Sequence, residues 1–443
     1  MTNIDIMTAE TRTKYPTLSA PTSNPKLVWL VIMLGFALRL LVPVFIPGVT
    51  RVLDQSVLFS TPINSFRSLE EALFLSFNNM NPYHEGEIVH HPPLVLELFK
   101  FLESPIPMNI FLALMDSFCG IQLIKLNKKL RDHDNDRSYY PDYVIAAFYS
   151  FNPLALLTVY AKSTNTINNF VFLTALNAFA SNPLGLSCMV LIAVSAYLSY
   201  YGWYFIIPML LFAYKKASKE GRGAGNIVFK SIFTFLLTLM VLLGISYKIS
   251  GSSFRFASLV YGTIVRFRKI TPNLGLWWYF FTEIFDAFSQ FYLGIFNLYS
   301  FIFVVPITMR FIGSEDSSII DAIFTVWSQV GILNISRAYP TIADNNIYFS
   351  MMILFKPLYR KLKFAPSVST LAMFTILLLL PVFYYVWMGA NSGNANFFYA
   401  IGLTHTLIEM VVLSDFFWSK LQLNYYKSKG IDPNKKELKL TQI

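Results

Sequence analysis

Long apolar runs alternate with short polar segments along almost the whole chain. The first run covers residues 27–47, and at roughly 20 residues it is long enough to cross a bilayer as a helix. Further apolar runs follow, and several are too short to span alone: residues 109–124, 143–161, 168–180, 183–201, 204–214, 227–249, 277–288, 291–311, 319–333, 347–355, 369–387 and 397–418. The pattern therefore predicts a helical protein that crosses a membrane many times.

Prolines interrupt several of these runs, because proline removes a backbone donor and bends or ends a helix. Pro153, Pro183, Pro208 and Pro340 are the predicted break points. Non-helical backbone at membrane depth has to be buried in protein or line a cavity. We therefore expect an all-α polytopic fold of about 10–13 transmembrane or re-entrant helices in one multi-span domain, residues 27–426.

Polar segments complete the layout. Residues 1–26 are rich in Thr, Ser, Pro and Asn, which predicts a disordered tail and no cleaved signal peptide. Residues 48–107 form the largest segment outside the apolar runs, with shorter polar loops at 250–273 and 388–396. No repeat or Gly-Ser linker divides the chain, so the simplest organisation is one membrane domain with a cap.

Composition supports a membrane protein. Hydrophobic residues make up 55% of the chain and charged residues 14%, whereas soluble domains carry about 25% charged residues. The two cysteines, Cys119 and Cys188, lie in apolar runs, which suits small core residues better than a disulfide or a zinc site.

The net charge of +10 comes from short basic clusters between apolar runs, so membrane topology explains it better than a nucleic-acid partner does. By the positive-inside rule these clusters face the cytosol, with both termini cytosolic, residues 427–443 a cytosolic tail and residues 48–107 luminal. The clusters are Lys125, Lys128, Lys129 and Arg131; Lys215, Lys216, Lys219 and Arg222; Lys356, Arg360, Lys361 and Lys363; and Lys427, Lys429, Lys435 and Lys436.

Histidines and carboxylates gather in the predicted luminal loop, at His84, Glu85, Glu87, His90 and His91. Such side chains bind divalent metals or carry out acid-base chemistry. The adjacent histidines precede two prolines that impose an extended backbone, which points their side chains to opposite faces. The alternative is a turn that packs the loop onto the membrane domain, and the sequence supports no metal assignment.

Ionisable residues inside apolar runs are the next candidates, because a charge at membrane depth marks a site or an internal ion pair. Glu283 and Asp286 lie three residues apart, which on a continuous helix places both on one face. An acidic pair beneath an aromatic belt suits a cationic group, and the alternative is an ion pair with Arg39 or Lys162. The remaining candidates are Asp116, Glu409 and Asp415.

A polar island covers Lys162 to Asn169 and includes Asn168. Amides and hydroxyls at membrane depth bind a polar ligand or hydrogen-bond neighbouring helices, and the second role is the more common.

A turn rich in asparagine, with Asn391, Asn394 and Asn396, leads directly into the aromatic residues Phe397, Phe398 and Tyr399. Asparagine donates and accepts hydrogen bonds, and a helix start attracts phosphate. The combination predicts a site for a phospholipid-like headgroup whose acyl chains lie in the bilayer, with Phe397, Phe398 and Tyr399 at the lipid boundary. The alternative is a helix cap with interfacial aromatic residues.

Several short segments, in order from about Arg39 to Tyr426, resemble the PIG-U family, subunit U of the glycosylphosphatidylinositol (GPI) transamidase complex. Each is weak alone, and the ordered set is specific: Thr61-Pro62, Asn64-Ser65-Phe66, Glu70-Glu71, Asn81-Pro82-Tyr83, Pro92-Pro93-Leu94, Phe151-Asn152-Pro153, Ala161-Lys162-Ser163-Thr164, Ile167-Asn168-Asn169, Pro272-Asn273-Leu274-Gly275, Phe285-Asp286, Tyr339-Pro340 and Asn394 to Ala400.

The resemblance implies a subunit of the endoplasmic reticulum membrane with no catalytic residue and no cofactor. Its implied partners are the other transamidase subunits, including the cysteine-protease-like one, and the GPI lipid. The family's lipid-contacting asparagines fall on Asn394 and Asn396. Relatives have His where this chain has Ala287, so a role of that His is lost here.

The family is also similar to the GPI mannosyltransferases, which implies a glycosyltransferase-C-like architecture. Those enzymes carry paired carboxylates in the first luminal loop. The start of that loop here, Thr50 to Gln55, has one acid, Asp54, and no Asp-x-Asp motif. A mannosyltransferase that uses a dolichol-phosphate donor, with Glu85 or Glu87 as replacements, is the alternative function. A transporter would need a continuous polar pathway, and no repeat supports one.

Overall fold

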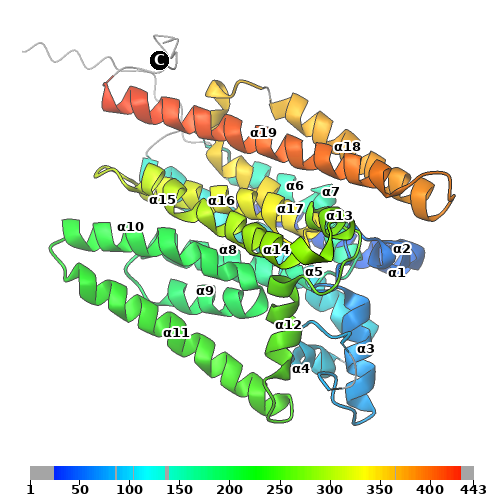
Figure 1. Ribbon diagram of the computed structural model, residues 1–443. Helices are drawn as coiled ribbons and strands as arrows, with labels where there is room; N and C mark the ends of the chain where they lie inside the picture. The colour runs from blue at the N-terminus through cyan, green and yellow to red at the C-terminus, as the bar shows by residue number, and fades with distance from the viewer. Residues whose placement is uncertain (1–23, 85–86, 103, 135–138, 365, 431–443) are drawn as a thin grey trace, which may run out of the picture.

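A computed structural model describes residues 24–84, 87–102, 104–134, 139–364 and 366–430, and the secondary structure of these residues consists of helices without a strand (Figure 1). The predicted all-α class is therefore confirmed. The predicted tails fall mostly outside these residues, and so does Glu85.

The first helix matches the first apolar run. α1 (Pro25–Phe45) begins at Asn24, whose side-chain oxygen accepts the backbone N–H groups of Lys26 and Leu27 at 3.2 and 3.4 Å. The segment predicted as a polar loop folds into three helices: α2 (Pro47–Gln55), α3 (Phe66–Phe77) and α4 (Pro93–Leu102). Phe66, Leu69 and Phe99 bury their side chains in a small separate core, which also includes Phe256. α3 and α4 of this segment therefore share an apolar core with α12 (Arg255–Arg266) and the start of α5 (Pro105–Asp134).

The next helices show how proline bends a span. They are α5 (Pro105–Asp134), α6 (Asp142–Ser150), α7 (Pro153–Tyr160), α8 (Asn165–Ser181) and α9 (Ser187–Leu198). α6 and α7 meet at a bend of 45°. Asn152 caps α7 by accepting the N–H of Leu154 at 3.0 Å, and Pro153 fills the first position of that helix. The break predicted at Pro153 is confirmed.

A short 3₁₀ segment, η1 (Tyr200–Phe205), leads into α10 (Ile206–Lys219), α11 (Ala224–Ile249) and α12 (Arg255–Arg266). Pro208 lies in the first turn of α10, where a missing N–H costs no helical hydrogen bond, so this proline starts a helix instead of breaking one. α12 lies in the segment predicted as a loop, and it packs beside α3 and α4 (Figure 1).

The remaining elements are α13 (Trp277–Glu283), α14 (Asp286–Ile302), α15 (Val304–Ile312), α16 (Ile319–Ser336), α17 (Ile342–Met352), η2 (Ile353–Lys361), α18 (Pro366–Met388) and α19 (Ala395–Ser428). Of the apolar window of α16, 89% is buried inside the protein, against 11% for α18. α16 is therefore the centre of the main core, and α18 lies at its edge.

Seven of the described helical segments are long and apolar enough to cross a membrane, or eight if α6 and α7 form one bent span. They are α1, α5, α11, the α14–α15 pair, α16, α18 and α19. The other helices are shorter, as the short apolar runs predicted. A polytopic membrane protein is the fold that these lengths support.

Candidate functional site

The turn predicted to bind a headgroup joins α18 to α19 in a long hairpin (Figure 1). The backbone N–H groups of Gly389 and Ala390 both donate to the carbonyl of Tyr385 at 2.8 Å, which closes the end of α18. Asn394 caps α19 by accepting the N–H of Asn396 at 3.1 Å. The capping alternative is therefore realised at Asn394, while the side chains of Asn391, Asn394 and Asn396 are all exposed.

Aromatic rings from three helices support this turn. Trp278 of α13 stacks on Trp387 of α18, with centroids 5.8 Å apart and an interplanar angle of 19°. Phe398 of α19 packs against both indoles and is 1% exposed. We expected Phe397, Phe398 and Tyr399 all to meet lipid, but Phe398 lies inside the aromatic layer. Phe397 is exposed and Tyr399 is half-buried.

Tyr279 of α13 connects the aromatic layer to the amides. Its hydroxyl donates to Oδ1 of Asn396, and its ring stacks on Tyr399 with centroids 4.4 Å apart. The side chain of Asn396 is thus held at its oxygen, which turns its NH₂ group outward as a donor. Sequence reasoning did not identify Tyr279 or Trp387 as site residues, and the run Trp277-Trp278-Tyr279 was the signal that pointed to α13.

Glu283 completes the rim of this group of side chains. Glu283 is exposed and lies four residues after Tyr279 on α13, so the two side chains share one face of that helix. Desolvation and the negative charge of Glu283 raise the pKa of Tyr279. Asp286 is exposed at the first turn of α14. The prediction that Glu283 and Asp286 share one helix face is wrong, because α13 ends at Glu283 and extended backbone at Ile284 and Phe285 separates the two acids.

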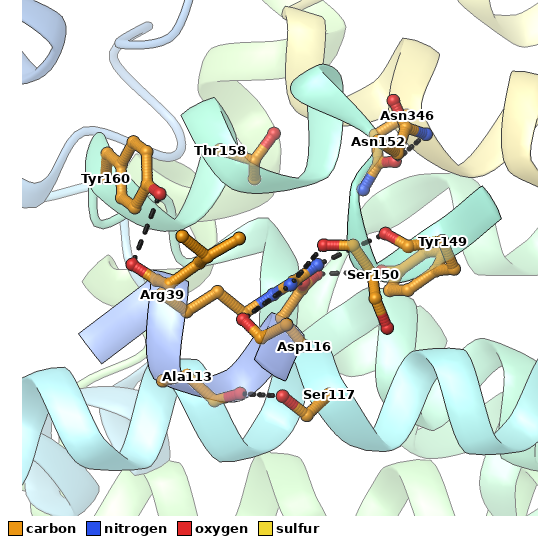
Figure 2. Close-up of polar contacts among 12 residues, drawn as sticks. Arg39, Ala113, Asp116, Ser117, Tyr149, Ser150, Asn152, Thr158, Tyr160 and Asn346 are labelled. Carbon is orange, nitrogen blue, oxygen red and sulfur yellow. Dashed lines mark hydrogen bonds and ion pairs between the residues drawn. The ribbon is translucent and has the colours of Figure 1, made fainter. Parts of the chain in front are cut away.

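The alternative pairing of these acids with Arg39 or Lys162 is also wrong. Arg39 of α1 donates from Nε to Asp116 of α5 at 2.6 Å, deep in the protein. Figure 2 shows the rest of this cluster, in which Arg39 donates to the carbonyls of Tyr149 and Ser150 while the Tyr149 hydroxyl donates to Asp116 at 2.7 Å. Every partner is internal, so this intramembrane pair joins helices.

Lys162 and Asn168 lie in contacts that do not involve the α13 and α19 residues described above. Lys162 has a left-handed backbone with φ of 51°, and its Nζ lies 4.5 Å from the ring centroid of Phe66. Oδ1 of Asn168 accepts the hydroxyl of Ser195 at 2.8 Å, which links α8 to α9. The helix-linking alternative therefore describes Asn168.

The histidine-rich segment packs a loop onto the domain. Nδ1 of His90 lies 2.7 Å from the carbonyl oxygen of Leu259, and Nε2 of His91 lies 3.3 Å from the Thr164 hydroxyl. Burial lowers the pKa of His91 to about 3. Glu87 is exposed, 3.9 Å from Arg268. No three His, Cys, Asp or Glu side chains in the described ranges gather as metal ligands, while Glu85 lies outside those ranges.

The remaining intramembrane acids have internal neighbours. A carboxylate oxygen of Glu409 lies 3.9 Å from Nδ1 of His405 on the same helix. Asp415 accepts the backbone N–H groups of Lys363 and Phe364 at 2.7 and 2.9 Å, which fixes the chain before α18 against α19. Both acids therefore lie within helix contacts.

The surface around the turn between α18 and α19 combines exposed amides and the Glu283 carboxylate over a layer of packed aromatic rings. Amide N–H groups donate hydrogen bonds to phosphate or sugar oxygens, and a carboxylate accepts from sugar hydroxyls or an ammonium group. We call Tyr279, Glu283, Asn391, Asn394 and Asn396 the amide site. Its composition suits binding of a polar headgroup at the edge of a membrane.

Comparison with known proteins adds independent information. The profile of a family described as GPI transamidase subunit PIG-U matches residues 33–405, which include the whole amide site. The chain is 36% identical over 408 residues to GPI transamidase component GAB1 of Saccharomyces cerevisiae, covering 92% of this chain and 97% of that protein. It is 29% identical over 436 residues to GPI-anchor transamidase component PIGU of Homo sapiens, covering 91% and 96% of the two chains.

Proposed function

Because the chain belongs to the PIG-U family and is therefore a GPI transamidase subunit, we propose that it binds the GPI lipid and positions it for attachment to proproteins. In this role the chain supplies no catalytic residue. Its partners are the other subunits of the complex, including the cysteine-protease-like subunit, and its location is the endoplasmic reticulum membrane with both termini in the cytosol.

The observation that carries the proposal is the bond from the Tyr279 hydroxyl to Asn396. A flexible surface amide pays conformational entropy when it orders around a ligand. Asn396 is already fixed by Tyr279 and by the backbone of α19, and the stacked rings of Tyr279 and Tyr399 hold that arrangement. The NH₂ group therefore faces outward ready to donate to a phosphate or sugar oxygen of GPI.

The neighbouring surface suits the lipid part of the same molecule. Phe397 is 50% exposed at the start of α19, and large apolar side chains of α18 such as Leu371, Phe374 and Leu378 are exposed along the hairpin. An acyl chain lying on this apolar surface keeps the headgroup at the amide site, because burial of apolar area stabilises the complex.

Positioning by itself accelerates the reaction. Holding the amine of GPI against the acyl-enzyme converts a bimolecular step into an effectively unimolecular one. No acid or base from this chain is needed for that gain. Glu283 suits a role in orienting the amine as its ammonium form, since it is the exposed carboxylate of the amide site.

The test replaces Asn396 with Leu in cells that depend on this chain, with attachment of GPI to a reporter proprotein as the measurement. We expect attachment to fall while the subunits still co-purify. Asn226→Leu is the matched control, because Asn226 is an exposed asparagine at the start of α11. Normal attachment by the Asn396 variant would reject the site.

The lipid that accumulates in depleted cells separates this proposal from the alternative. A positioning subunit predicts accumulation of complete GPI. A mannosyltransferase predicts accumulation of a precursor that lacks a sugar, and transfer of mannose by the purified chain.

A further inference from the structure

Two adjoining cavities lie at the end of the helical bundle opposite the amide site, where α10, α15 and α19 end (Figure 1). The larger has a volume of about 530 Å³ and the smaller about 270 Å³, and His133 and Ser318 line both. Asn424 on the wall of the larger cavity lies about 40 Å from Asn396 along the axis of α19. The pair of cavities is therefore separate from the amide site.

The larger cavity has one buried ion pair and an unpaired cation at its rim. Nζ of Lys420 lies 2.6 Å from Asp321, and the two side chains are 7% and 12% exposed. Lys427 lies 3.6 Å from Asp134 at the surface. Arg310 is exposed, and in the described part of the chain no carboxylate lies within ion-pair distance of it.

The smaller cavity is strongly basic. Lys215, Lys216 and Lys219 line it with a single carboxylate, that of Glu315. Lys215 donates to the carbonyls of Gly313 and Ser314, and no carboxylate of the described ranges forms an ion pair with it. Lys216 lies 4.0 Å from Glu220, whereas Lys219 has no ion pair among the described residues. Three serines share the wall. The hydroxyls of Ser181 and Ser318 already donate to the Asn177 carbonyl and to Asp321, whereas that of Ser317 has no hydrogen bond in the part of the chain that the structure describes.

Topology alone explains lysines near this end, because basic residues fix the orientation of a membrane protein. It does not require that they line a cavity beside a free serine hydroxyl, that of Ser317. Together the two cavities hold six Lys and Arg side chains against four carboxylates, and the most buried carboxylate is already neutralised by Lys420. The remaining potential attracts an anion.

The surroundings indicate that the anion belongs to a lipid. Arg310 lies on α15, whose neighbouring side chains Val305 and Met309 are exposed apolar groups. α14 and α15 together form a segment apolar enough to cross the membrane. A headgroup in the cavities would therefore have its acyl chains along this apolar wall. Basic pockets between transmembrane helices on the cytosolic side bind inositol phosphate headgroups.

We propose that the two cavities form one site for the phosphorylated headgroup of an inositol phospholipid in the leaflet that the positive-inside rule assigns to the cytosol. Arg310 and Lys219 contact the phosphates, one from each cavity. The Ser317 hydroxyl donates to a further headgroup oxygen, and the acyl chains lie against α15. The site does not depend on GPI binding at the amide site.

The test uses the intact purified transamidase complex in phosphatidylcholine nanodiscs and a dye-labelled short-chain phosphatidylinositol 4-phosphate, with fluorescence anisotropy as the readout. We expect saturable binding that phosphatidylserine does not displace at equal charge. The double variant Lys219→Gln/Arg310→Gln should bind roughly 30-fold more weakly, since two basic contacts are lost.

The matched control is Lys128→Gln/Lys230→Gln, which removes the same charge from exposed residues outside both cavities. Complex assembly of both variants is checked by size-exclusion chromatography. Equal weakening in the two double variants would overturn the proposal, because it would show general electrostatic attraction. Full displacement by soluble inositol 1,4-bisphosphate at the lipid's own concentration would overturn the lipid assignment.

Discussion

Arg39 and Asp116 form a buried ion pair that joins α1 to α5, with Nε and Oδ2 2.6 Å apart and side chains only 1% and 2% exposed. Arg39 also donates to the carbonyls of Gly35, Tyr149 and Ser150. The hydroxyl of Tyr149 donates to the second oxygen of Asp116. Each charge therefore has a full set of partners, and neither is free to act on a ligand.

Removing one member of this pair should destabilise the protein strongly. Arg39→Met leaves the Asp116 carboxylate buried without a cation, a change that costs about 3–5 kcal/mol in comparable sites. We expect a large fall in the amount of assembled complex and in its Tm. The double variant Arg39→Met/Asp116→Leu should recover most of the loss. If the double variant is as unstable as Arg39→Met, an unpaired Asp116 carboxylate does not cause the loss of stability.

Gly35 should tolerate no side chain, because α1 passes very close to α6 there. A Cβ at Gly35 would lie 2.6 Å from Cβ of Ser150. Gly35→Ala should therefore cost about 1–3 kcal/mol by overpacking. Ser150→Gly in the same chain should restore part of the Tm. Gly294→Ala is the control, because its Cβ would meet no atom within 4 Å, and an equal loss there would contradict the packing argument.

Tyr279→Phe tests the contact that holds Asn396. The variant keeps the ring stack on Tyr399 and removes only the hydroxyl that donates to Asn396. We expect GPI attachment to fall roughly 2- to 10-fold, which corresponds to the free energy of one hydrogen bond, while the complex still assembles. Tyr385→Phe, at an exposed tyrosine of α18, should have no effect. Unchanged attachment by Tyr279→Phe would show that the bond does not prepare the site.

His91 should make the complex less stable in acid. Burial lowers its pKa from 6.5 to about 3, so between these values the unfolded chain binds a proton that the folded chain does not. The stability present above pH 6.5 is therefore lost as the pH falls, by about 2 kcal/mol at pH 5. The Tm measured from pH 7.5 to pH 5 should fall less steeply in His91→Gln, while His84→Gln, at an exposed histidine, should follow the wild type.

Asp54 should act in the opposite direction. Burial and then the charge of Glu70 raise the pKa of this carboxyl from 3.8 to about 6. The contribution of protonated Asp54 to stability is full below pH 3.8 and is lost as the pH rises through 6. Asp54→Asn should therefore raise stability at pH 7.4 by about 1 kcal/mol, reduced for its half-exposed position. Asp132→Asn, at an exposed position, is the control. Equal Tm values for Asp54→Asn and Asp132→Asn at pH 7.4 would contradict the raised pKa of Asp54.

The sequence identified the turn at 389–396 and the start of α19 as a candidate site, because local features decide both. An asparagine cap and a glycine-containing turn are local in the chain, and so is the bend at Pro153. Features that depend on contacts between distant segments could not be predicted from the sequence. Residues 48–107 read as a polar loop, yet they hold α2, α3 and α4, and α3 and α4 pack with α12 around a second core, because short amphipathic helices gain stability only from packing.

By itself, the sequence determined that this chain is a membrane protein. Helices that cross the hydrocarbon of a bilayer must be long and apolar, and such a chain has few charged residues. The sequence also determined which family the chain resembles. The tertiary structure decided which polar groups meet. It paired Asp116 with Arg39 and placed the Tyr279 hydroxyl where it donates to Asn396. It also separated Glu283 from Asp286 by the break between α13 and α14. Such contacts depend on how several helices pack at once, and no spacing within a single helix specifies that packing.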